Sequence, residues 1–255
     1  MGWGDEIIVS GMARRLQRKN PLPVRVVDAR GRTRWSAIWE QNPRFALPAY
    51  AGEVQVLLNA PGKRGYISGK TKDGWKWRDW ICPLGEIHLT PQEAEFGGKH
   101  AGKILLEPGL KPDASPNKNW GASRWAALAR QLTAAGHPVA QFASPHCTPL
   151  PGVELIQTKS FRDACAVIAR ARLAILPEGG LHHAAASFGT AAIVIFGGYI
   201  SPNQTGYAHH LNLFSGGTPC GRRTPCLHCS KAMKKITVAE VFDHALSLLR
   251  VIRFD

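Results

Sequence analysis

The sequence predicts an α/β fold built on mostly parallel sheets. Short apolar runs alternate with amphipathic, helix-compatible segments along most of the chain, and this alternation is typical of strands joined by crossover helices. The clearest unit spans residues 173–197, where two apolar runs flank a Gly-Gly turn and an Ala-rich segment. A length of 255 residues allows one large domain or two modest ones, each with its own core.

The unit at residues 173–197 also predicts a place for a ligand. Gly179-Gly180 permits a sharp turn after the first strand, and a helix is expected to follow over 181–188. The turn sets Glu178 beside the first backbone N–H groups of that helix, where a phosphate or a ribose would be held. A βαβ turn without any ligand fits the same pattern equally well.

The first hundred residues predict helices, two strands and a basic aromatic segment. Asp5 ends a Gly-rich loop at residues 1–5 and would occupy the N-cap or first turn of a helix, where the helix dipole stabilises its carboxylate. Trp35 and Trp39 lie four apart and can share one side of a helical turn. The expected elements are a helix over 6–19, strands over 23–28 and 53–59, a helical turn within 30–41 and a short helix starting over 90–95.

The second half continues the alternation after Gly97-Gly98, which we interpret as a linker. Ser160 and Thr237 are suitable N-caps for two of its helices. The expected elements are strands over 103–107, 138–143, 173–176, 191–196 and 211–214, helices over 123–135, 160–171, 181–188 and 237–251, and a loop over 108–119.

The net charge of +14 and the isoelectric point near 9.9 indicate a polyanionic partner. Nucleic acid, an acidic membrane surface and a phosphorylated glycan are the candidates. Residues 63–80 carry six basic and two acidic side chains, with Tyr66, Trp75, Trp77 and Trp80 interleaved. Basic side chains can follow phosphates while aromatic rings stack on bases, although tryptophans of a protein core would give the same composition.

The six cysteines are too few for a disulfide scaffold in a chain of this length, and we expect a reduced, intracellular protein. We expect neither a secretory signal nor a membrane-spanning segment. Cys220, Cys226 and Cys229 have the spacing of zinc ligands, with His228 beside them. Because there is a single such cluster and its histidine directly precedes a cysteine, zinc is the weaker interpretation, and no metal is expected.

Four motifs stand in a recognisable order: Gly4-Asp5 at a helix start, Asn117-Lys118-Asn119-Trp120 before a helix, Glu178-Gly-Gly-Leu-His-His-Ala-Ala-Ala, and Phe196-Gly-Gly followed by Pro202-Asn-Gln-Thr-Gly206. Together they resemble glycosyltransferase family nine, the ADP-heptose lipopolysaccharide heptosyltransferases. The resemblance implies a GT-B fold, in which two Rossmann-like domains with mostly parallel sheets face each other across a cleft. It also implies a shortened acceptor-side domain over residues 1–100 and a nucleotide-sugar donor domain over residues 101–255.

The resemblance further implies an inverting, metal-independent glycosyltransferase that uses a UDP-, ADP- or GDP-linked sugar and requires no cofactor. It places the catalytic base at Asp5. The donor-binding residues would be Lys118, Glu178, Gly179, Gly180, Leu181, His182, His183, Thr205 and Gly206. With the basic aromatic segment included, the acceptor-binding residues would be Gly4, Arg14, Lys70, Lys72, Trp75, Lys76, Trp77 and Arg78.

The chain departs from the family pattern at two places. Glu178 and Gly179 stand where the family has Asp and Thr or Ser, which affects the choice of donor. The shortened first domain indicates an acceptor other than the lipopolysaccharide core, and residues 63–80 favour DNA with a hydroxymethylated pyrimidine, as for a viral member of the family.

Three alternatives remain open. They are transfer to a lipopolysaccharide core or another glycan, a non-catalytic relative that binds nucleic acid, and a sugar-nucleotide epimerase or hydrolase on the same fold. The expected location is the cytoplasm of a bacterium or of an infected host cell.

Overall fold

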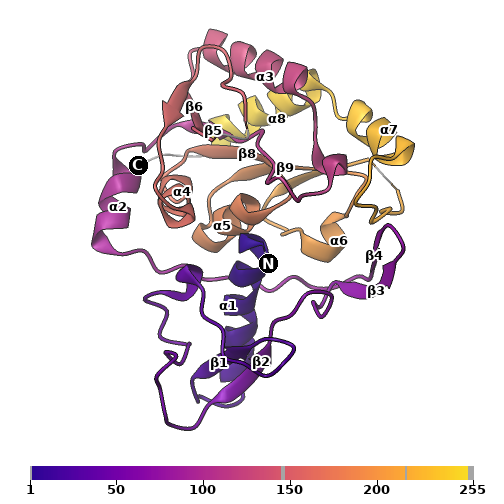
Figure 1. The fold of residues 1–255 in the computed structure, drawn as a ribbon. Helices are drawn as coiled ribbons and strands as arrows, with labels where there is room; N and C mark the ends of the chain where they lie inside the picture. The colour runs from indigo at the N-terminus through magenta and orange to yellow at the C-terminus, as the bar shows by residue number, and fades with distance from the viewer. Residues whose placement is uncertain (1, 145–146, 216, 252–255) are drawn as a thin grey trace.

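A six-stranded sheet whose neighbouring strands all run parallel forms the centre of the molecule (Figure 1). The computed structural model describes residues 2–144, 147–215 and 217–251. Read from the β7 edge, the strands follow the order 3-2-1-4-5-6 of dinucleotide-binding folds, with the reversal between β5 and β8. This confirms the predicted α/β class. The strands are β5 (Ile104–Leu106), β6 (Val139–Phe142), β7 (Glu154–Ile156), β8 (Leu173–Pro177), β9 (Ala192–Gly197) and β10 (Leu211–Phe214).

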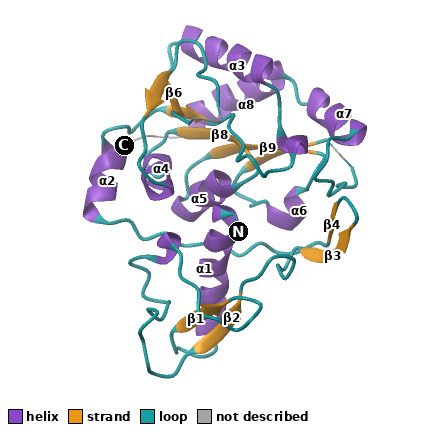
Figure 2. Ribbon diagram, in the orientation of Figure 1, coloured by secondary structure: helices purple, strands orange, loops and turns teal. Residues whose placement is uncertain are grey.

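Each face of this sheet has its own hydrophobic core. On β5, Leu105 belongs to one core while Ile104 and Leu106 belong to the other. A strand that is buried on both faces must be apolar along its whole length, which explains the unbroken apolar runs in the sequence. One face is covered by α3 (Ala122–Ala134) and α8 (Val238–Val251), and the opposite face by α4 (Phe161–Ile168) and α5 (Gly180–Phe188) (Figure 2).

The first half of the chain packs on the face that α4 and α5 cover, and it shares their core. Helix α1 (Trp3–Gln17) runs from α5 toward the parallel pair β1 (Val24–Val27) and β2 (Gln55–Leu58) (Figure 1). An antiparallel hairpin of β3 (Ile67–Thr71) and β4 (Gly74–Trp77) follows, and then α2 (Pro91–Gly98).

This half is smaller than a second Rossmann-like domain. The connection between β1 and β2 carries only the 3₁₀ turn Ala37–Trp39, so the described residues place a two-stranded parallel sheet here. The expected boundary at residues 100 and 101 stays a prediction. No helix in the described part of the chain is long and apolar enough to span a membrane.

Gly97-Gly98 is not a linker, contrary to the expectation, because both residues belong to α2. A Cβ atom at Gly97 would lie 2.3 Å from the carbonyl oxygen of Ala166 in α4, so the glycine permits close contact between the two helices. Thr90 and Glu93 cap the start of α2 reciprocally, as a capping box does.

Two other local expectations need correction. The loop expected over residues 1–5 is shorter, because α1 already begins at Trp3 and Asp5 lies in its first turn. The stretch 30–41 holds only a 3₁₀ turn, which Ser36 caps. The hairpin strands β3 and β4, strand β7 and two helices, α6 (Pro202–Thr205) and α7 (Leu227–Lys235), were not predicted.

Candidate functional site

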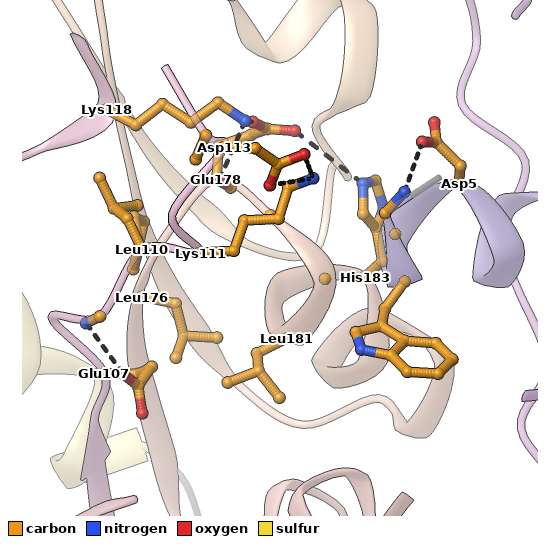
Figure 3. A pocket seen from close by; sticks show the side chains of 18 of the residues that line it. Asp5, Glu107, Leu110, Lys111, Asp113, Lys118, Leu176, Glu178, Leu181 and His183 are labelled. Atoms are coloured by element: carbon orange, nitrogen blue, oxygen red, sulfur yellow. Dashed lines mark hydrogen bonds and ion pairs between the residues drawn. The ribbon is translucent and has the colours of Figure 1, made fainter. Parts of the chain in front are cut away.

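A cavity of about 820 Å³ opens where the strand order of the large sheet reverses. Glu107 directly follows β5 and Glu178 directly follows β8, so both carboxylates lie at the carboxyl end of the sheet and line the cavity (Figure 3). Ligands of open α/β sheets bind at this position. The start of α1 and the hairpin β3–β4 form the opposite wall.

Glu178 is buried and held by two partners from different elements. Lys118 forms a short ion pair with Oε2 of Glu178, and Thr205 in α6 donates a hydrogen bond of 3.1 Å to Oε1. Burial alone would raise the pKa of Glu178, but the charge and hydrogen bond of Lys118, together with His182 and Thr205, outweigh it and lower the pKa. The carboxylate is therefore ionised and its charge is matched by Lys118.

The start of α5 presents backbone N–H groups to the cavity. Gly179, Gly180 and Leu181 line it, and the first amides of a helix have no acceptor within that helix. With the positive end of the helix dipole and the ammonium group of Lys118 close by, this wall can bind an anion such as a diphosphate.

The two histidines at the start of α5, His182 and His183, differ in position. His182 is fully buried beneath the cavity, where its ring nitrogens lie 3.1 Å from the carbonyl oxygen of Gly179 and 3.0 Å from that of Thr205. His183 lines the cavity, and its Nδ1 lies 2.8 Å from the hydroxyl group of Tyr207. Burial, reinforced by Lys118 and His210, lowers the pKa of His183 to about 3, so its ring is neutral at pH 7.

Asp5 reaches the same cavity from the first turn of α1. Its Oδ1 accepts a hydrogen bond of 2.6 Å from the hydroxyl group of Tyr66 and lies 2.5 Å from Nε of Arg64. Its Oδ2 lies 3.4 Å from the backbone nitrogen of Gly2. Both strong contacts therefore fall on one oxygen, which leaves the other available to a ligand.

Gly4 acts through packing. A Cβ atom at this position would lie 2.6 Å from Cδ2 of His183. The glycine thus lets the start of α1 touch α5, and this contact brings Asp5 to the same cavity as Glu178 and His183.

The predicted acceptor residues are only partly gathered at the cavity. Trp75 and Trp77 line it from one face of β4. The basic residues Lys70, Lys72, Lys76 and Arg78 of the hairpin are exposed to solvent. Lys76 lies on the face of β4 opposite to Trp75 and Trp77 because side chains alternate along a strand, whereas Lys70 is the cross-strand partner of Trp75 and shares its face.

Arg14 does not line the cavity. It pairs with Glu86 at 3.2 Å and donates to the carbonyl oxygen of Leu84. Thr205 and Gly206 also lie outside the cavity lining, and Thr205 acts on it through Glu178.

Several cavity residues were not expected from the sequence. Arg64 and Tyr66 hold Asp5, and the only signal for them was their place in the basic aromatic segment. Glu107 ended an expected strand but carried no motif. Its burial raises its pKa to about 7, against the opposing hydrogen bonds from the backbone N–H groups of Gly109 and Phe142.

Within the part of the chain that the structure describes, two groups of side chains bring enough ligand atoms together for a metal ion. Glu178, His182 and His183 form the first group. However, His182 already contacts two carbonyl oxygens, and Glu178 already forms an ion pair with Lys118. The second group lies outside the cavity and consists of Cys220, Cys226, His228 and Cys229.

The sequence matches the family described as glycosyltransferase family 9 (heptosyltransferase) over residues 86–237. No curated protein matches the chain. Among solved structures, a family 9 glycosyltransferase from Veillonella parvula is similar, with a TM-score of 0.69 and 15% identity over 99% of this chain and 96% of that chain.

Two further solved structures from E. coli share the fold. The iron-containing dodecameric glycosyltransferase TibC has a TM-score of 0.66 and 14% identity, over 99% of this chain and 75% of that one. The ADP-heptose lipopolysaccharide heptosyltransferase II has a TM-score of 0.50 and 17% identity, over 68% of this chain and 55% of that one. Since the family match covers more than half of its residues, this chain belongs to glycosyltransferase family 9 and is a glycosyltransferase.

Proposed function

We infer that this protein transfers a sugar from a nucleotide-diphosphate sugar to a hydroxyl group of a polyanionic acceptor, with inversion and without a catalytic metal. One observation carries the proposal. Asp5 on one wall and Lys118 with the start of α5 on the other line a single cavity of about 820 Å³. A base for the acceptor and a cationic site for the leaving group thus face the same space.

The donor's diphosphate would lie between Lys118 and the first amides of α5. Its negative charges would share Lys118 with Glu178, whose other carboxylate oxygen keeps its hydrogen bond from Thr205. Such charges near a helix start are stabilised as they develop on the departing group. The heptosyltransferase from E. coli carries ADP-heptose in its name, which supports a nucleotide diphosphate as the leaving group; UDP-, ADP- and GDP-sugars are the candidate donors.

Asp5 would act as the general base through its Oδ2 atom. It takes the proton of the acceptor hydroxyl, the oxygen attacks the anomeric carbon, and the bond from that carbon to the phosphate oxygen breaks with both electrons leaving on the diphosphate. Arg64 and Tyr66 fix the carboxylate through Oδ1, so its second oxygen is held in position. The attack from the side opposite to the leaving group inverts the anomeric centre.

The hairpin β3–β4 favours DNA with a hydroxymethylated pyrimidine as acceptor. Trp75 and Trp77 face the cavity, where an extruded base can stack. The exposed cations of the hairpin, Lys70, Lys72, Lys76 and Arg78, can follow the phosphates. The family description and the heptosyltransferase match favour a second candidate, transfer to a lipopolysaccharide core or another phosphorylated glycan.

A two-step experiment tests the proposal. A thermal-shift screen of ADP-, UDP- and GDP-sugars identifies the donor, because a ligand at a hundredfold its Kd stabilises a protein by about 2.7 kcal/mol. Transfer is then measured to duplex DNA with and without hydroxymethylcytosine, and to a phosphorylated glycan, with the wild type and Asp5→Asn.

We expect Asp5→Asn to bind the donor normally and to lose about 10²–10⁴-fold in transfer rate. Transfer to the glycan alone would select the second acceptor. Donor binding without transfer to any acceptor would indicate a non-catalytic relative, and donor turnover without acceptor a hydrolase or epimerase.

A further inference from the structure

Four potential metal ligands meet at the start of α7 and in the segment before it, outside the cavity. Sγ of Cys220 lies 3.0 Å from Sγ of Cys229 and 3.6 Å from Sγ of Cys226. Nδ1 of His228 lies 3.8 Å from Sγ of Cys229. The four ligand atoms all lie within 4.8 Å of one another, so the neighbouring positions of His228 and Cys229 in the chain do not keep their ligand atoms apart.

We propose that Cys220, Cys226, His228 and Cys229 form a tetrahedral site for a divalent metal ion of the zinc class. Metal–sulfur bonds of about 2.3 Å at tetrahedral angles separate ligand atoms by roughly 3.5–4 Å, a spacing that small shifts of these side chains reach. Three thiolates and one imidazole are a ligand set of structural zinc sites, and thiolates also suit ferrous iron. The proposal does not depend on the proposed sugar transfer.

The backbone around the cluster is arranged for thiolates. The N–H group of Arg222 points at Sγ of Cys220, and that of Cys229 points at Sγ of Cys226, both at 3.4 Å. Cys226 is also the N-cap of α7, where the helix dipole stabilises a negative sulfur. Gly198 makes room for the imidazole, since a Cβ atom there would lie 3.0 Å from Cε1 of His228.

The closest sulfur pair is not a disulfide. Its separation of 3.0 Å is well beyond an S–S bond of about 2.05 Å, and each cysteine of the cluster is free. A metal ion would hold the three sulfurs together in a reducing compartment, where a disulfide is not stable.

The metal centre would fix a segment that supports both walls of the cavity. On one side, the N–H group of Trp75 donates to the carbonyl oxygen of Gly221 at 3.1 Å, and that of Arg223 donates to the carbonyl oxygen of Asp73 at 2.8 Å. A Cβ atom at Gly74 would lie only 2.0 Å from the same oxygen of Gly221. The hairpin that carries Trp75 and Trp77 thus rests directly on the cysteine segment.

On the other side, the segment holds the loop of Lys118. The amide group of Asn117 donates to the carbonyl oxygens of Arg222 and Thr224 at 2.8 and 2.7 Å, and its oxygen accepts from the N–H group of Cys226 at 3.1 Å. Loss of the metal should therefore loosen the hairpin and the Lys118 loop together.

Metal analysis of the full chain tests the proposal. Protein purified without a metal-affinity step is analysed by plasma mass spectrometry for zinc and iron, and then reconstituted with Co²⁺, whose visible spectrum reports tetrahedral thiolate ligation. We expect about one ion per chain, the element distinguishing zinc from iron, and a thiolate–cobalt charge-transfer band. Cys226→Ser, Cys229→Ser and His228→Ala should weaken or abolish metal binding, whereas Cys82→Ser, a cysteine outside the cluster, should retain it.

Hydrogen exchange distinguishes local loosening after metal loss from unfolding of the whole protein, and Asp5→Asn distinguishes metal binding from catalysis. Chelation or Cys229→Ser should accelerate exchange in residues 67–77 and around Asn117 while β8 and β9 stay protected. Asp5→Asn should keep the metal, so failure of the proposed transfer would leave this result intact. Substoichiometric metal after Co²⁺ or Zn²⁺ addition, a disulfide found by mass, or full metal retention in both cysteine variants would each overturn the proposal.

Discussion

Lys118 compensates a buried negative charge in this structure. Its ammonium group pairs with Glu178, whose side chain is only 6% exposed, and it also lies 5.3 Å from the centre of the Tyr199 ring. A buried carboxylate that loses its cation is left with an uncompensated charge, which costs about 3–5 kcal/mol. Lys118 therefore stabilises the free protein through Glu178, and under the proposed function it would pair with the donor's phosphates as well.

This dual role predicts a separable pair of effects. Lys118→Met should destabilise the protein by about 3 kcal/mol and weaken donor binding by at least about 30-fold, the equivalent of about 2 kcal/mol. The double variant Lys118→Met/Glu178→Gln should recover most of the stability but not the donor affinity. Chemical denaturation and calorimetry measure the two quantities, and recovery of donor affinity in the double variant would contradict this assignment.

Glu107 is the second residue whose surroundings set its charge. Burial raises its pKa to about 7 from an ordinary value of 4.5. Between these two pH values the folded state binds more protons at this site than the unfolded state does, so stability falls as pH rises.

Glu107→Gln should remove this decline. At pH 4, where both states are protonated, the variant and the wild type should be equally stable, and at pH 8 the variant should be more stable by up to about 3 kcal/mol. Glu154→Gln is the contrasting control, because hydrogen bonding and charge from Lys103 lower the pKa of Glu154 and its loss should slightly destabilise the protein at pH 8. The free energy of unfolding is measured by denaturation at both pH values without donor. An equal effect of Glu107→Gln at pH 4 and pH 8 would contradict the raised pKa of Glu107.

Site residues that belong to a local motif could be predicted from the sequence. Glu178, Gly179, Gly180 and His183 are neighbours in the chain, and all line the cavity. Tyr66 and Arg14 could not be placed, because the Tyr66–Asp5 contact spans 61 positions and the Arg14–Glu86 contact spans 72. Such pairings are decided by the tertiary packing of α1 and the hairpin.

The contact between α2 and α4 shows how one glycine fixes the approach of two elements. Gly97→Ala would set a Cβ atom 2.3 Å from the backbone oxygen of Ala166, which cannot move without shifting α4. We expect a loss of about 1–3 kcal/mol in the free energy of unfolding.

The next residue provides a matched control. A Cβ atom at Gly98 meets nothing within 4 Å, and alanine is the better helix former, so Gly98→Ala should be neutral or stabilising by up to about 1 kcal/mol. Urea unfolding of both variants tests the contact, and equal stabilities would show that the two helices are not closely packed.

Elements with a strong periodic or apolar signal were predictable, and short or polar ones were not. The fully buried β8 and β9 were found nearly to the residue. β7 was missed because it has three residues and the first two are exposed. α7 was missed because its start lies within the cysteine cluster and its N-cap is Cys226, which is not a typical cap.

The molecule carries a net charge of +14, but not every basic group is available to an anionic partner. Arg64, for example, is already paired with Asp5 within the fold. If the exposed lysines of the hairpin contact DNA phosphates, binding must weaken with salt by counterion release. Each lysine removed should lower the slope of log K against log salt by about 1.

A triple variant tests this at the level of the molecule. Lys70→Ala/Lys72→Ala/Lys76→Ala should lower the salt slope by about 3. Arg18→Ala/Lys19→Ala removes two exposed cations from the end of α1 that lies far from the cavity (Figure 1) and should leave the slope nearly unchanged. Duplex affinity measured from low to moderate salt gives the slope, and equal slopes for the two variants would argue against the hairpin as a DNA-binding surface.

The contact between α1 and α5 has a consequence for how the molecule meets its substrates. Gly4 lies against His183, and a Cβ atom at Gly180 would lie 3.2 Å from that of Trp3, so two helix ends from opposite walls touch with no clearance between them. A side chain at either glycine would push the two helix ends apart, so these glycines set the distance between Asp5 and the start of α5. We expect this distance to limit the size of the donor sugar that the cavity accepts.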